Sequence, residues 1–371
     1  MTSSNSTIRR ALESGNPVVQ GNRVTFIWEG DSAPQLMSDL TGWEEKPKPF
    51  KRVSSTPRSA SSPSGKTLWS CSLTVPRDAY IEYAFYDAAS QEKFLDPWNE
   101  RTVNNGLGSR NNFFYMPETM PSPFSMRRAT VHASTLTRHR VSTDLLQDDS
   151  ERDVYLYKSP VSDPVPLLID YDGYEYLNRG KLTTIMDNLI ADRLICPIAI
   201  AFLLNGKSRR NVEYLCSDAT ITWLEREILP LAHEHLRLLD LAEHPGAYAV
   251  LGASAGGLMS MYTGLRMPEI FGKVLCQSAV FSLDGRDLSA VDLVRSGHVR
   301  DLKIWMDVGK LEELVEDNRR MVALLRDKEY KVTYREFSAS HNYTAWRDDI
   351  WYGLEEMFPP TSSPLASAGI S

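Results

Sequence analysis

The sequence has few cysteines, no long hydrophobic run and no excess of positive charge. Its 371 residues include four scattered cysteines, Cys71, Cys196, Cys216 and Cys276. None forms a CxxC pair, so a disulfide framework and a zinc site are excluded and reduced thiols are expected. The sequence contains no run of about 18 apolar residues, so no membrane span is predicted. The 41 Lys and Arg against 48 Asp and Glu give a net charge of -7, which argues against nucleic acid or an anionic membrane as partner.

The N-terminal stretch MTSSNSTIRRALESGNP lacks the apolar segment of a secretory signal. Together with the unpaired cysteines, this predicts a cytoplasmic protein. At 42% hydrophobic and 24% charged residues the composition is that of a globular protein, and the length is sufficient for two domains.

The first third of the chain reads as short β-segments. RVTFIWEG, TLWSCSLTVP and YIEYAFYDA alternate apolar with polar residues between Gly, Pro, Asn and Asp. We therefore expect a flexible N-terminus over 1–20 and a small all-β, immunoglobulin-like sandwich over 21–118. The Ser/Pro-rich stretch 54–66 predicts a mobile hairpin loop.

From about residue 129 strands alternate with helices. VPLLIDYDG, CPIAIAFLL, GAYAVLGAS and LKIWMDVGK are apolar runs, and KLTTIMDNLIADRL and EELVEDNRRMVALLRDKEY have helical spacing. Buried strands alternating with amphipathic helices predict an α/β fold with a mostly parallel, doubly wound sheet. We place a linker and the first strand region at 119–150, the catalytic domain at 151–359 and a disordered tail at 360–371.

The stretch VLGASAGGLMSMY (250–262) sets Ser254 between an apolar strand and an apolar helix. This is the setting of a G-x-S-x-G nucleophile elbow, whose sharp turn requires small residues such as Gly252 and Gly256. A plain glycine-rich turn is the alternative. A dinucleotide-binding GxGxxG is excluded because Ser254 occupies the position of its middle glycine.

A serine nucleophile needs a base and an orienting acid. His341 follows the last predicted strand, where such a base is expected, whereas six other histidines fall on helix faces or connecting loops: His132, His139, His233, His235, His244 and His298. For the acid we favour Glu312, three residues after Gly309. Glu313, Asp307 and a bare Ser–His dyad remain open.

An oxyanion hole needs two backbone N–H donors. One is expected from Ala255, next to the serine. The other is expected from Gly173 or Tyr174, in the loop after the LLIDYDG strand, although IDYDGYEY is equally compatible with a plain β-turn.

The stretches LLIDYDG, VLGASAGGLMSMYTGLRMPEIFGKVLCQSAVF, WMDVGKLEE and EFSASHNYTAW together resemble the enterochelin (enterobactin) esterase family of esterase D-like α/β-hydrolases. The resemblance covers about 150–358. It implies Ser254 as nucleophile, His341 as base and Glu312 as acid, with no metal or organic cofactor. Its R-x-x-E element implies an ion pair between Arg210 and Glu213.

Two departures from the family pattern lie at the acyl pocket. The base stands in ASHN rather than after two glycines, and Ala255 replaces a bulkier residue. Both departures therefore bear on the choice of substrate rather than on the chemistry.

The N-terminal segment resembles the early-set, glycogen-binding-like sandwiches that precede many such catalytic domains. Trp43 and Trp98 are candidates for a sugar platform, but packing is the favoured role of Trp28, Trp69 and Trp98. By resemblance, this module caps the active site.

These features predict a serine carboxylesterase. The resemblance implies a catecholate siderophore such as ferric enterobactin, whose trilactone is cut to release iron. Candidates for binding this anion and its rings are Arg179, Arg209, Arg210, Arg347 and Trp346.

The alternatives to this function are a carbohydrate (feruloyl or acetyl) esterase, a general esterase of the esterase D type and a non-catalytic binding protein. The oligomeric state, homo-oligomer included, stays open.

Overall fold

The computed structural model describes residues 10–11, 13–53, 66–146 and 150–360. The chain divides into two compact units. The smaller unit contains Met1–Met120, Lys310–Glu312 and Phe337–Asn342, and the larger unit contains the rest. The predicted loop at 54–66 and the tail at 360–371 fall almost wholly outside the described residues, as does much of the expected flexible N-terminus.

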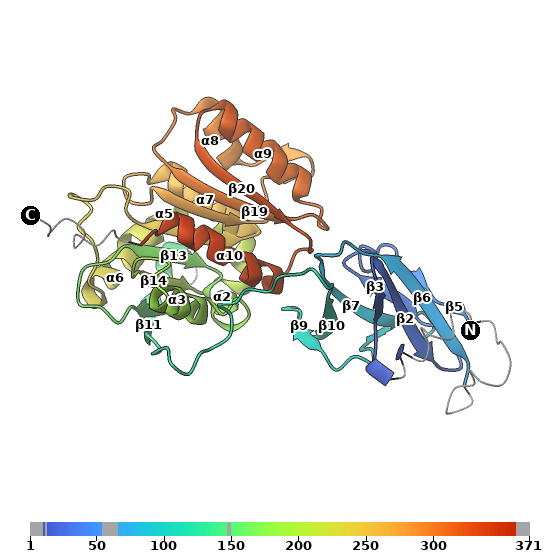
Figure 1. Cartoon of the computed structure of the whole chain (residues 1–371). Helices are drawn as coiled ribbons and strands as arrows, with labels where there is room; N and C mark the ends of the chain where they lie inside the picture. The colour runs from blue at the N-terminus through green and yellow to red at the C-terminus, as the bar shows by residue number, and fades with distance from the viewer. Residues whose placement is uncertain (1–9, 12, 54–65, 147–149, 361–371) are drawn as a thin grey trace, which may run out of the picture. The chain divides into compact units, whose positions relative to one another are not determined.

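The smaller unit contains two antiparallel sheets (Figure 1). The first has the order β1-β2-β6-β5, and the second has the order β4-β3-β7-β10-β9, with β8 paired to β7. The strands are β1 (Val18–Gln20), β2 (Arg23–Glu29), β3 (Gln35–Ser38), β4 (Lys48–Pro49), β5 (Lys51–Arg52), β6 (Leu68–Thr74), β7 (Tyr80–Asp87), β8 (Glu92–Phe94), β9 (Thr102–Asn104) and β10 (Arg110–Tyr115). The all-β prediction for this part of the chain is confirmed.

Aromatic side chains fill the core of the smaller unit. Phe26 of β2 meets Tyr83 of β7 edge to face, with ring centroids 4.8 Å apart, and Phe114 of β10 completes the cluster. Trp28 and Trp69 pack against this core, and Trp98 packs against a second cluster around Val18. These positions follow from the period-2 alternation that predicted the strands.

The larger unit is built on one eight-stranded sheet of order β11-β12-β14-β13-β15-β16-β19-β20. The pairs from β14 through β13, β15 and β16 to β19 are parallel, while β12 is antiparallel to both β14 and β11. The strands are β11 (Thr135–Ser142), β12 (Glu151–Lys158), β13 (Leu167–Tyr171), β14 (Ala199–Leu203), β15 (Ala249–Ala253), β16 (Lys273–Gln277), β19 (Lys303–Gly309) and β20 (Lys331–Phe337), and a separate hairpin joins β17 (Ser282–Leu283) to β18 (Arg286–Asp287). The predicted mostly parallel α/β sheet is confirmed.

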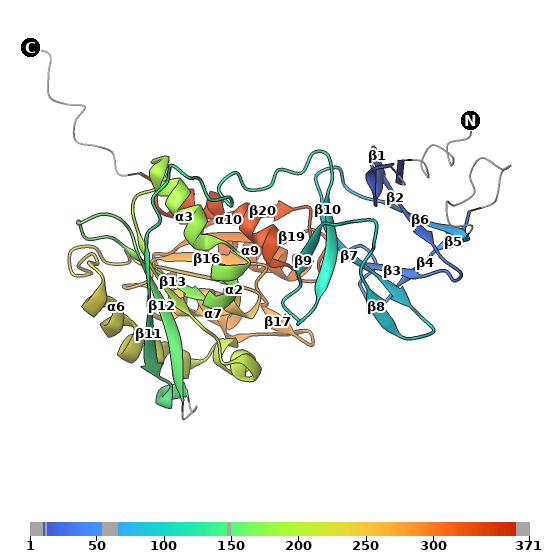
Figure 2. The same ribbon diagram turned by 90° about the horizontal axis from the view of Figure 1, so that it is seen from below.

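Helices cover both faces of this sheet. Figure 2 shows α3 and α10 on one face and α6 and α7 on the other. The helices are α2 (Gly173–Asn178), α3 (Leu182–Ala191), α4 (Arg210–Tyr214), α5 (Asp218–Trp223), α6 (Leu229–His235), α7 (Ala255–Arg266), α8 (Ser289–Ser296), α9 (Val315–Asp327) and α10 (Tyr343–Met357). Double coverage explains why β13, β14 and β15 are buried along their whole lengths.

Some boundaries differ from the pattern-based expectation. The segment from α5 to α6 is not one regular α-helix, since it contains a π-helical turn at Leu224–Ile228, just before Pro230, which has no N–H for the regular ladder. The helix predicted from Glu312 begins at Val315. None of the helices in the described ranges is both long and apolar enough to cross a membrane.

Candidate active site

Ser254 occupies the turn between β15 and α7. Its backbone has φ 59° and ψ -123°, a conformation that a residue with a side chain rarely adopts. The turn is held by the Ser254 N–H, which donates to the Gln277 carbonyl at 2.9 Å, and by the Ser254 carbonyl, which accepts from Leu258 at 3.1 Å. Such strain at a strand-to-helix turn is the mark of a nucleophile elbow.

The small residues around Ser254 are required by close packing. A methyl group on Gly252 would lie 2.3 Å from the Gly256 carbonyl oxygen, and one on Gly257 would lie 2.9 Å from Ala279 Cβ. The glycines therefore let the strand and the helix approach each other across the serine.

The loop after β13 lies beside the elbow. β13 and β15 are parallel neighbours, with Asp170 opposite Leu251, so both strands end at the same edge of the sheet. The α2 helix then begins at Gly173, where a methyl group would lie 2.7 Å from the Phe202 backbone. The first N–H groups of a helix have no partner inside it, so both α2 and α7 present donors at this edge. The expected alternative of a plain β-turn at this loop is replaced by the short α2 helix.

Asp172 and Arg210 connect these two helix starts. The Arg210 Nε donates to the two carboxylate oxygens of Asp172 at 2.7 and 2.9 Å, and its Nη2 bonds to Asp172 Oδ2 as well. The same Nη2 donates to the carbonyl of Ala253, directly before Ser254, at 3.3 Å. Burial lowers the pKa of Arg210, but its bonds to Asp172 outweigh burial and leave the pKa above the ordinary value.

The ion pair implied between Arg210 and Glu213 is therefore wrong. Glu213 is bound by Arg152 of β12 through two hydrogen bonds of 2.8 Å, and its side chain is only 4% exposed. A carboxylate so deeply buried needs a buried cation, which β12 supplies from outside α4. No sequence pattern singles out Asp172, although it stands next to Gly173 in the motif that predicted the oxyanion loop.

His341 and Glu312 form a hydrogen-bonded pair. His341 Nδ1 bonds to Glu312 Oε2, and the Glu312 side chain is 2% exposed against 36% for His341. Both lie on the segments after β19 and β20 that belong to the smaller unit. The two segments are joined by the Lys310 and Leu311 N–H groups, which donate to the Phe337 and Ala339 carbonyls at 2.8 and 3.1 Å.

The same two segments are bound to the sandwich. Leu311, next to Glu312, packs against the aromatic core of the smaller unit, and the Tyr80 N–H donates to the Ser338 carbonyl at 3.0 Å. The sandwich strands thus hold the backbone on either side of the His341–Glu312 pair.

The other two candidate acids have different surroundings. Asp307 lies within β19, fully buried, and its Oδ2 accepts from Gln277 Nε2 at 2.7 Å. Gln277 Oε1 in turn accepts from Tyr176 at 2.9 Å. Glu313 follows Glu312 in the chain but belongs to the larger unit.

The residues predicted to bind substrate are mostly engaged inside the larger unit. Arg179 pairs with Glu175 at 3.1 Å and lies over the Tyr343 ring, and Arg347 pairs with Asp348 at 2.9 Å. Arg209 ends a 3-10 turn, where its N–H donates to the Gly206 carbonyl at 3.0 Å.

Trp346 does not fit the role of a substrate contact. It is 3% exposed, and its indole N–H donates to Ser278 Oγ at 2.9 Å. The large apolar surface of its indole is instead buried inside the larger unit.

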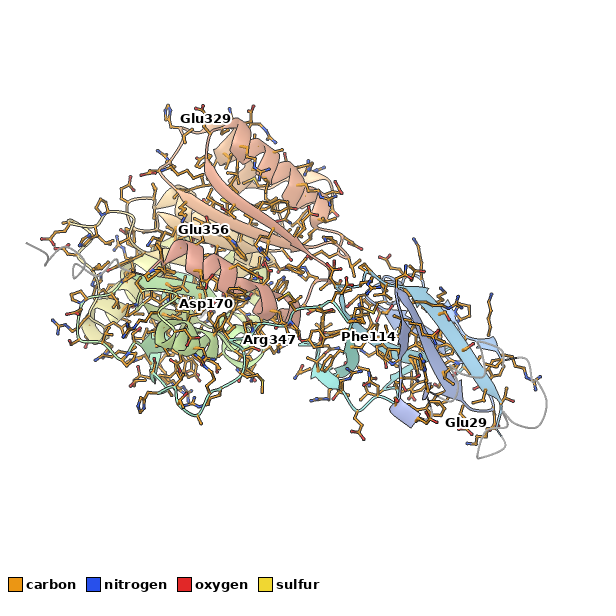
Figure 3. The ribbon with its side chains drawn as sticks, viewed as in Figure 1. Glu29, Phe114, Asp170, Glu329, Arg347 and Glu356 are labelled. Atoms are coloured by element: carbon orange, nitrogen blue, oxygen red, sulfur yellow. The ribbon has the colours of Figure 1, made fainter. Side chains whose placement is uncertain are left out.

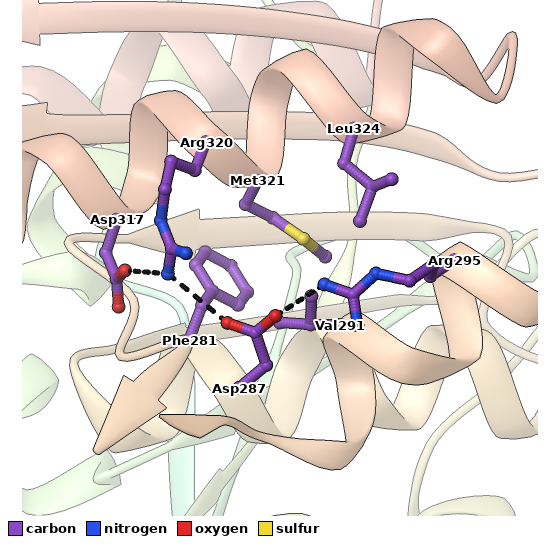
Figure 4. Close-up of a pocket in the computed structure, with 8 residues that line it drawn as sticks. All are labelled: Phe281, Asp287, Val291, Arg295, Asp317, Arg320, Met321 and Leu324. Carbon is purple, nitrogen blue, oxygen red and sulfur yellow. Dashed lines mark hydrogen bonds and ion pairs between the residues drawn. The ribbon is translucent and has the colours of Figure 1, made fainter. Parts of the chain in front are cut away.

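A pocket of about 100 Å³ lies elsewhere on the larger unit, between β18, α8 and α9 (Figure 4). Its floor is apolar, with Phe281, Val291, Met321 and Leu324. At its rim Asp287 is bound by Arg295 and also by Arg320, at 3.3 Å. These charged groups pair with one another, and the eight lining residues include no serine, threonine or cysteine.

A family model described as "Putative esterase" matches residues 146–357, more than half of the chain. The chain belongs to this family. The match covers the elbow, the loop after β13, Glu312 and His341, so the prediction of an ester hydrolase family is confirmed.

Individual relatives agree with this assignment. The esterase is 29% identical to the iron(III) enterobactin esterase of Dickeya dadantii over 60% of this chain, and it spans about half (55%) of that relative. The resemblance to enterobactin esterases is thereby confirmed.

Two solved structures show how far the fold is shared. The enterobactin esterase FES from Shigella flexneri, crystallised in the presence of enterobactin, is similar with a TM-score of 0.74 at 18% identity, over 92% of this chain and 95% of that one. A ferulic acid esterase from Anaeromyces mucronatus is similar with a TM-score of 0.54 at 16% identity, over 64% of this chain and 95% of that one. The first likeness extends to the N-terminal sheets, whereas the second covers less of the chain.

Proposed function

We propose that this esterase is a serine carboxylesterase in which Ser254, His341 and Glu312 act as a catalytic triad. The observation that carries the proposal is the strained backbone of Ser254 at the turn from β15 to α7. The His341–Glu312 hydrogen bond supports it, as does the chain order of serine, acid and histidine.

The proposed reaction begins with attack of Ser254 Oγ on the ester carbonyl carbon while His341 takes the serine proton at Nε2. Glu312 accepts the Nδ1–H of His341, which keeps the lone pair on Nε2 and stabilises the imidazolium. The N–H groups of Ala255 and of Gly173 or Tyr174 hold the oxyanion. The C–O bond to the alcohol then breaks, and His341 returns the proton to the departing oxygen.

The remaining acyl-enzyme is released by water. His341 takes a proton from the water as its oxygen attacks the acyl carbon, and then gives that proton to Ser254 Oγ as the acid leaves. The serine and the imidazole return to their starting state, and no step needs a metal or an organic cofactor.

The proposed substrate is a catecholate siderophore with ester-linked units, such as ferric enterobactin. Support comes from the relative named iron(III) enterobactin esterase and from the likeness of fold that extends over both units. The cytoplasmic location expected from the sequence stays a prediction.

A fluorophosphonate probe with peptide mass spectrometry tests the chemistry. We expect the probe on Ser254, loss of ester hydrolysis in Ser254→Ala, and a fall of roughly 10²- to 10⁴-fold in kcat in Glu312→Gln, because the imidazole loses its anchored tautomer. Ser260→Ala is the matched control, since this buried serine lies six residues further along the chain, in α7, and its hydroxyl donates to the Gly256 carbonyl at 2.9 Å. Turnover in Ser254→Ala would contradict the proposal.

The substrate class is tested by comparing kcat/KM for ferric enterobactin and methyl ferulate. The proposal expects a clear preference for the siderophore. A preference for methyl ferulate would instead favour the carbohydrate esterase hypothesis while leaving the triad in place.

A further inference from the structure

One guanidinium links the loop after β13 to the residue before Ser254. Arg210 holds both oxygens of Asp172 and also reaches the Ala253 carbonyl. Asp172 is 2% exposed and Arg210 is 25% exposed, so the pair is largely shielded from water. Asn205 Nδ2 completes the shell of the carboxylate, donating to Oδ1 at 2.5 Å.

The backbone of Asp172 is fixed by several further contacts. It has φ 68° and ψ 37°, in the left-handed region, and its N–H donates to the Tyr214 hydroxyl at 3.2 Å. Its carboxylate also lies against the elbow helix, since a methyl group on Gly256 would be 3.3 Å from Asp172 Oδ2. Asp172 therefore touches the first turn of α7 and directly precedes Gly173 at the start of α2.

We propose that the Arg210–Asp172 ion pair is a positioning device for the oxyanion hole. It fixes the N–H groups at the start of α2 relative to the N–H of Ala255 at the start of α7. This inference rests on the proposed function, because it assigns the two helix starts to the oxyanion. Arg210 and Asp172 are positioning residues, and neither touches the reacting atoms in this assignment.

The chemistry explains why such a device is useful. Donors stabilise an oxyanion only if they already point to the place where the charge develops, and a misplacement of about 1 Å can cost about 10²-fold in rate. The donors here come from two separate helices, and one of them, α2, has only six residues. An arginine is suited to the link because its planar fork binds a carboxylate through two groups at once, which lysine cannot do.

Three variants separate this role from others. Arg210→Lys keeps the charge but removes the fork and the reach to Ala253, and Asp172→Asn keeps the shape but removes the charge. The double variant Asp172→Asn/Arg210→Gln leaves no unpaired charge, which guards against a mere failure to fold. Arg335→Lys is the matched control, because Arg335 binds Asp349 through the same two-armed geometry, at 2.8 and 2.9 Å, between β20 and α10.

The readouts are kcat and KM for a nitrophenyl ester, with inhibition by a trifluoromethyl ketone and by its methyl ketone counterpart. Only the fluorinated ketone forms an oxyanion on the serine, so it reports on the oxyanion hole. In Arg210→Lys and in the double variant we expect kcat to fall about 10- to 100-fold, KM to stay within about twofold, and affinity for the fluorinated ketone to fall in parallel with kcat. The affinity of these variants for the methyl ketone should stay unchanged, and the control variant Arg335→Lys should keep the wild-type kcat and the wild-type affinity for both ketones.

Three results would overturn the inference. These are an unchanged kcat in the folded Arg210 variants, a loss confined to KM, which would make Arg210 a substrate contact, or equal losses for both ketones. These outcomes differ from failure of the proposed function itself, because in that case the wild-type protein would not carry the fluorophosphonate on Ser254.

Discussion

Gly252 lies where the strand before Ser254 passes close to the helix that follows it. A methyl group at this position would be 2.3 Å from the Gly256 oxygen and 2.9 Å from the Gly256 Cα. Both are backbone atoms of the helix that presents the Ala255 N–H, so they cannot give way without moving the elbow. The residue type at 252 therefore controls the placement of the nucleophile.

Gly252→Ala should consequently lower both stability and reactivity. We expect a loss of about 1–3 kcal/mol in the free energy of unfolding from overpacking and roughly a 10²-fold slower labelling of Ser254 by a fluorophosphonate. Gly256→Ala is the graded comparison, because its methyl group would lie 3.3 Å from the Asp172 carboxylate and 3.5 Å from Tyr171 Cβ, a milder crowding of side-chain atoms that leaves the backbone of the elbow in place. Urea unfolding and labelling rates measure the two effects, and equal behaviour of the two variants would refute the packing argument.

At the scale of elements, Arg152 and Glu213 tie strand β12 to helix α4. Their side chains are 8% and 4% exposed, and Glu213 also accepts the Gly206 N–H at 3.0 Å. The pair therefore fixes the start of the segment that carries Arg210.

Breaking this pair on one side should cost more than removing it from both. Arg152→Met leaves a buried carboxylate without its cation, and we expect a loss of about 3–5 kcal/mol in the free energy of unfolding. The double variant Arg152→Met/Glu213→Gln should recover most of it, since glutamine still accepts from Gly206. Arg138→Met, which removes an exposed arginine paired with Asp153, should change the free energy of unfolding only slightly. Urea unfolding measures these differences. A double variant as unstable as Arg152→Met would show that the loss does not come from an unpaired buried carboxylate.

Local patterns in the sequence predicted the elements of this fold and the serine elbow, because strand periodicity and turn glycines are short-range signals. They did not predict the partners of Arg210 and Glu213. A spacing of three residues suggested that the two bind each other, whereas the real partners, Asp172 and Arg152, lie 38 and 61 residues away in the chain. Such pairings depend on how β13 and β12 are ordered in the sheet, which local patterns do not contain.

Local sequence patterns also did not predict that the segments carrying Glu312 and His341 belong to the same unit as the N-terminal sheets. Leu311 reads as one apolar residue at a helix start, but it packs against aromatic residues from the first third of the chain. The start of α9 at Val315 is consistent with this, since the N–H groups of Lys310 and Leu311 already bond to Phe337 and Ala339.

At the scale of the whole molecule, each unit buries acids whose pKa is raised in the fold. Burial raises the pKa of Asp39 and Asp96 in the smaller unit, and the charge of Glu82 raises that of Asp39 further. In the larger unit, burial and the charge of Asp172 raise the pKa of Asp170 (Figure 3), whose carboxyl oxygens have no hydrogen-bond partner among the described residues. These folded-state carboxyls bind protons that the unfolded chain releases above about pH 4.

Stability should therefore fall as the pH rises above about 4, until each acid ionises in the fold. A carboxyl whose pKa is raised in the fold makes its full contribution to the free energy of unfolding at pH values below its unfolded-state pKa. Above that pKa the free energy of unfolding falls by up to about 1.4 kcal/mol per pH unit for each such carboxyl. We expect both units to be more stable at pH 5.5 than at pH 8. Asp170→Asn, which mimics the neutral acid, should flatten this dependence in the larger unit alone. Hydrogen exchange followed on peptides from β13 and β7, corrected for intrinsic rates, separates the units. A variant that keeps the wild-type slope in the β13 peptides would show that Asp170 is not the group that titrates.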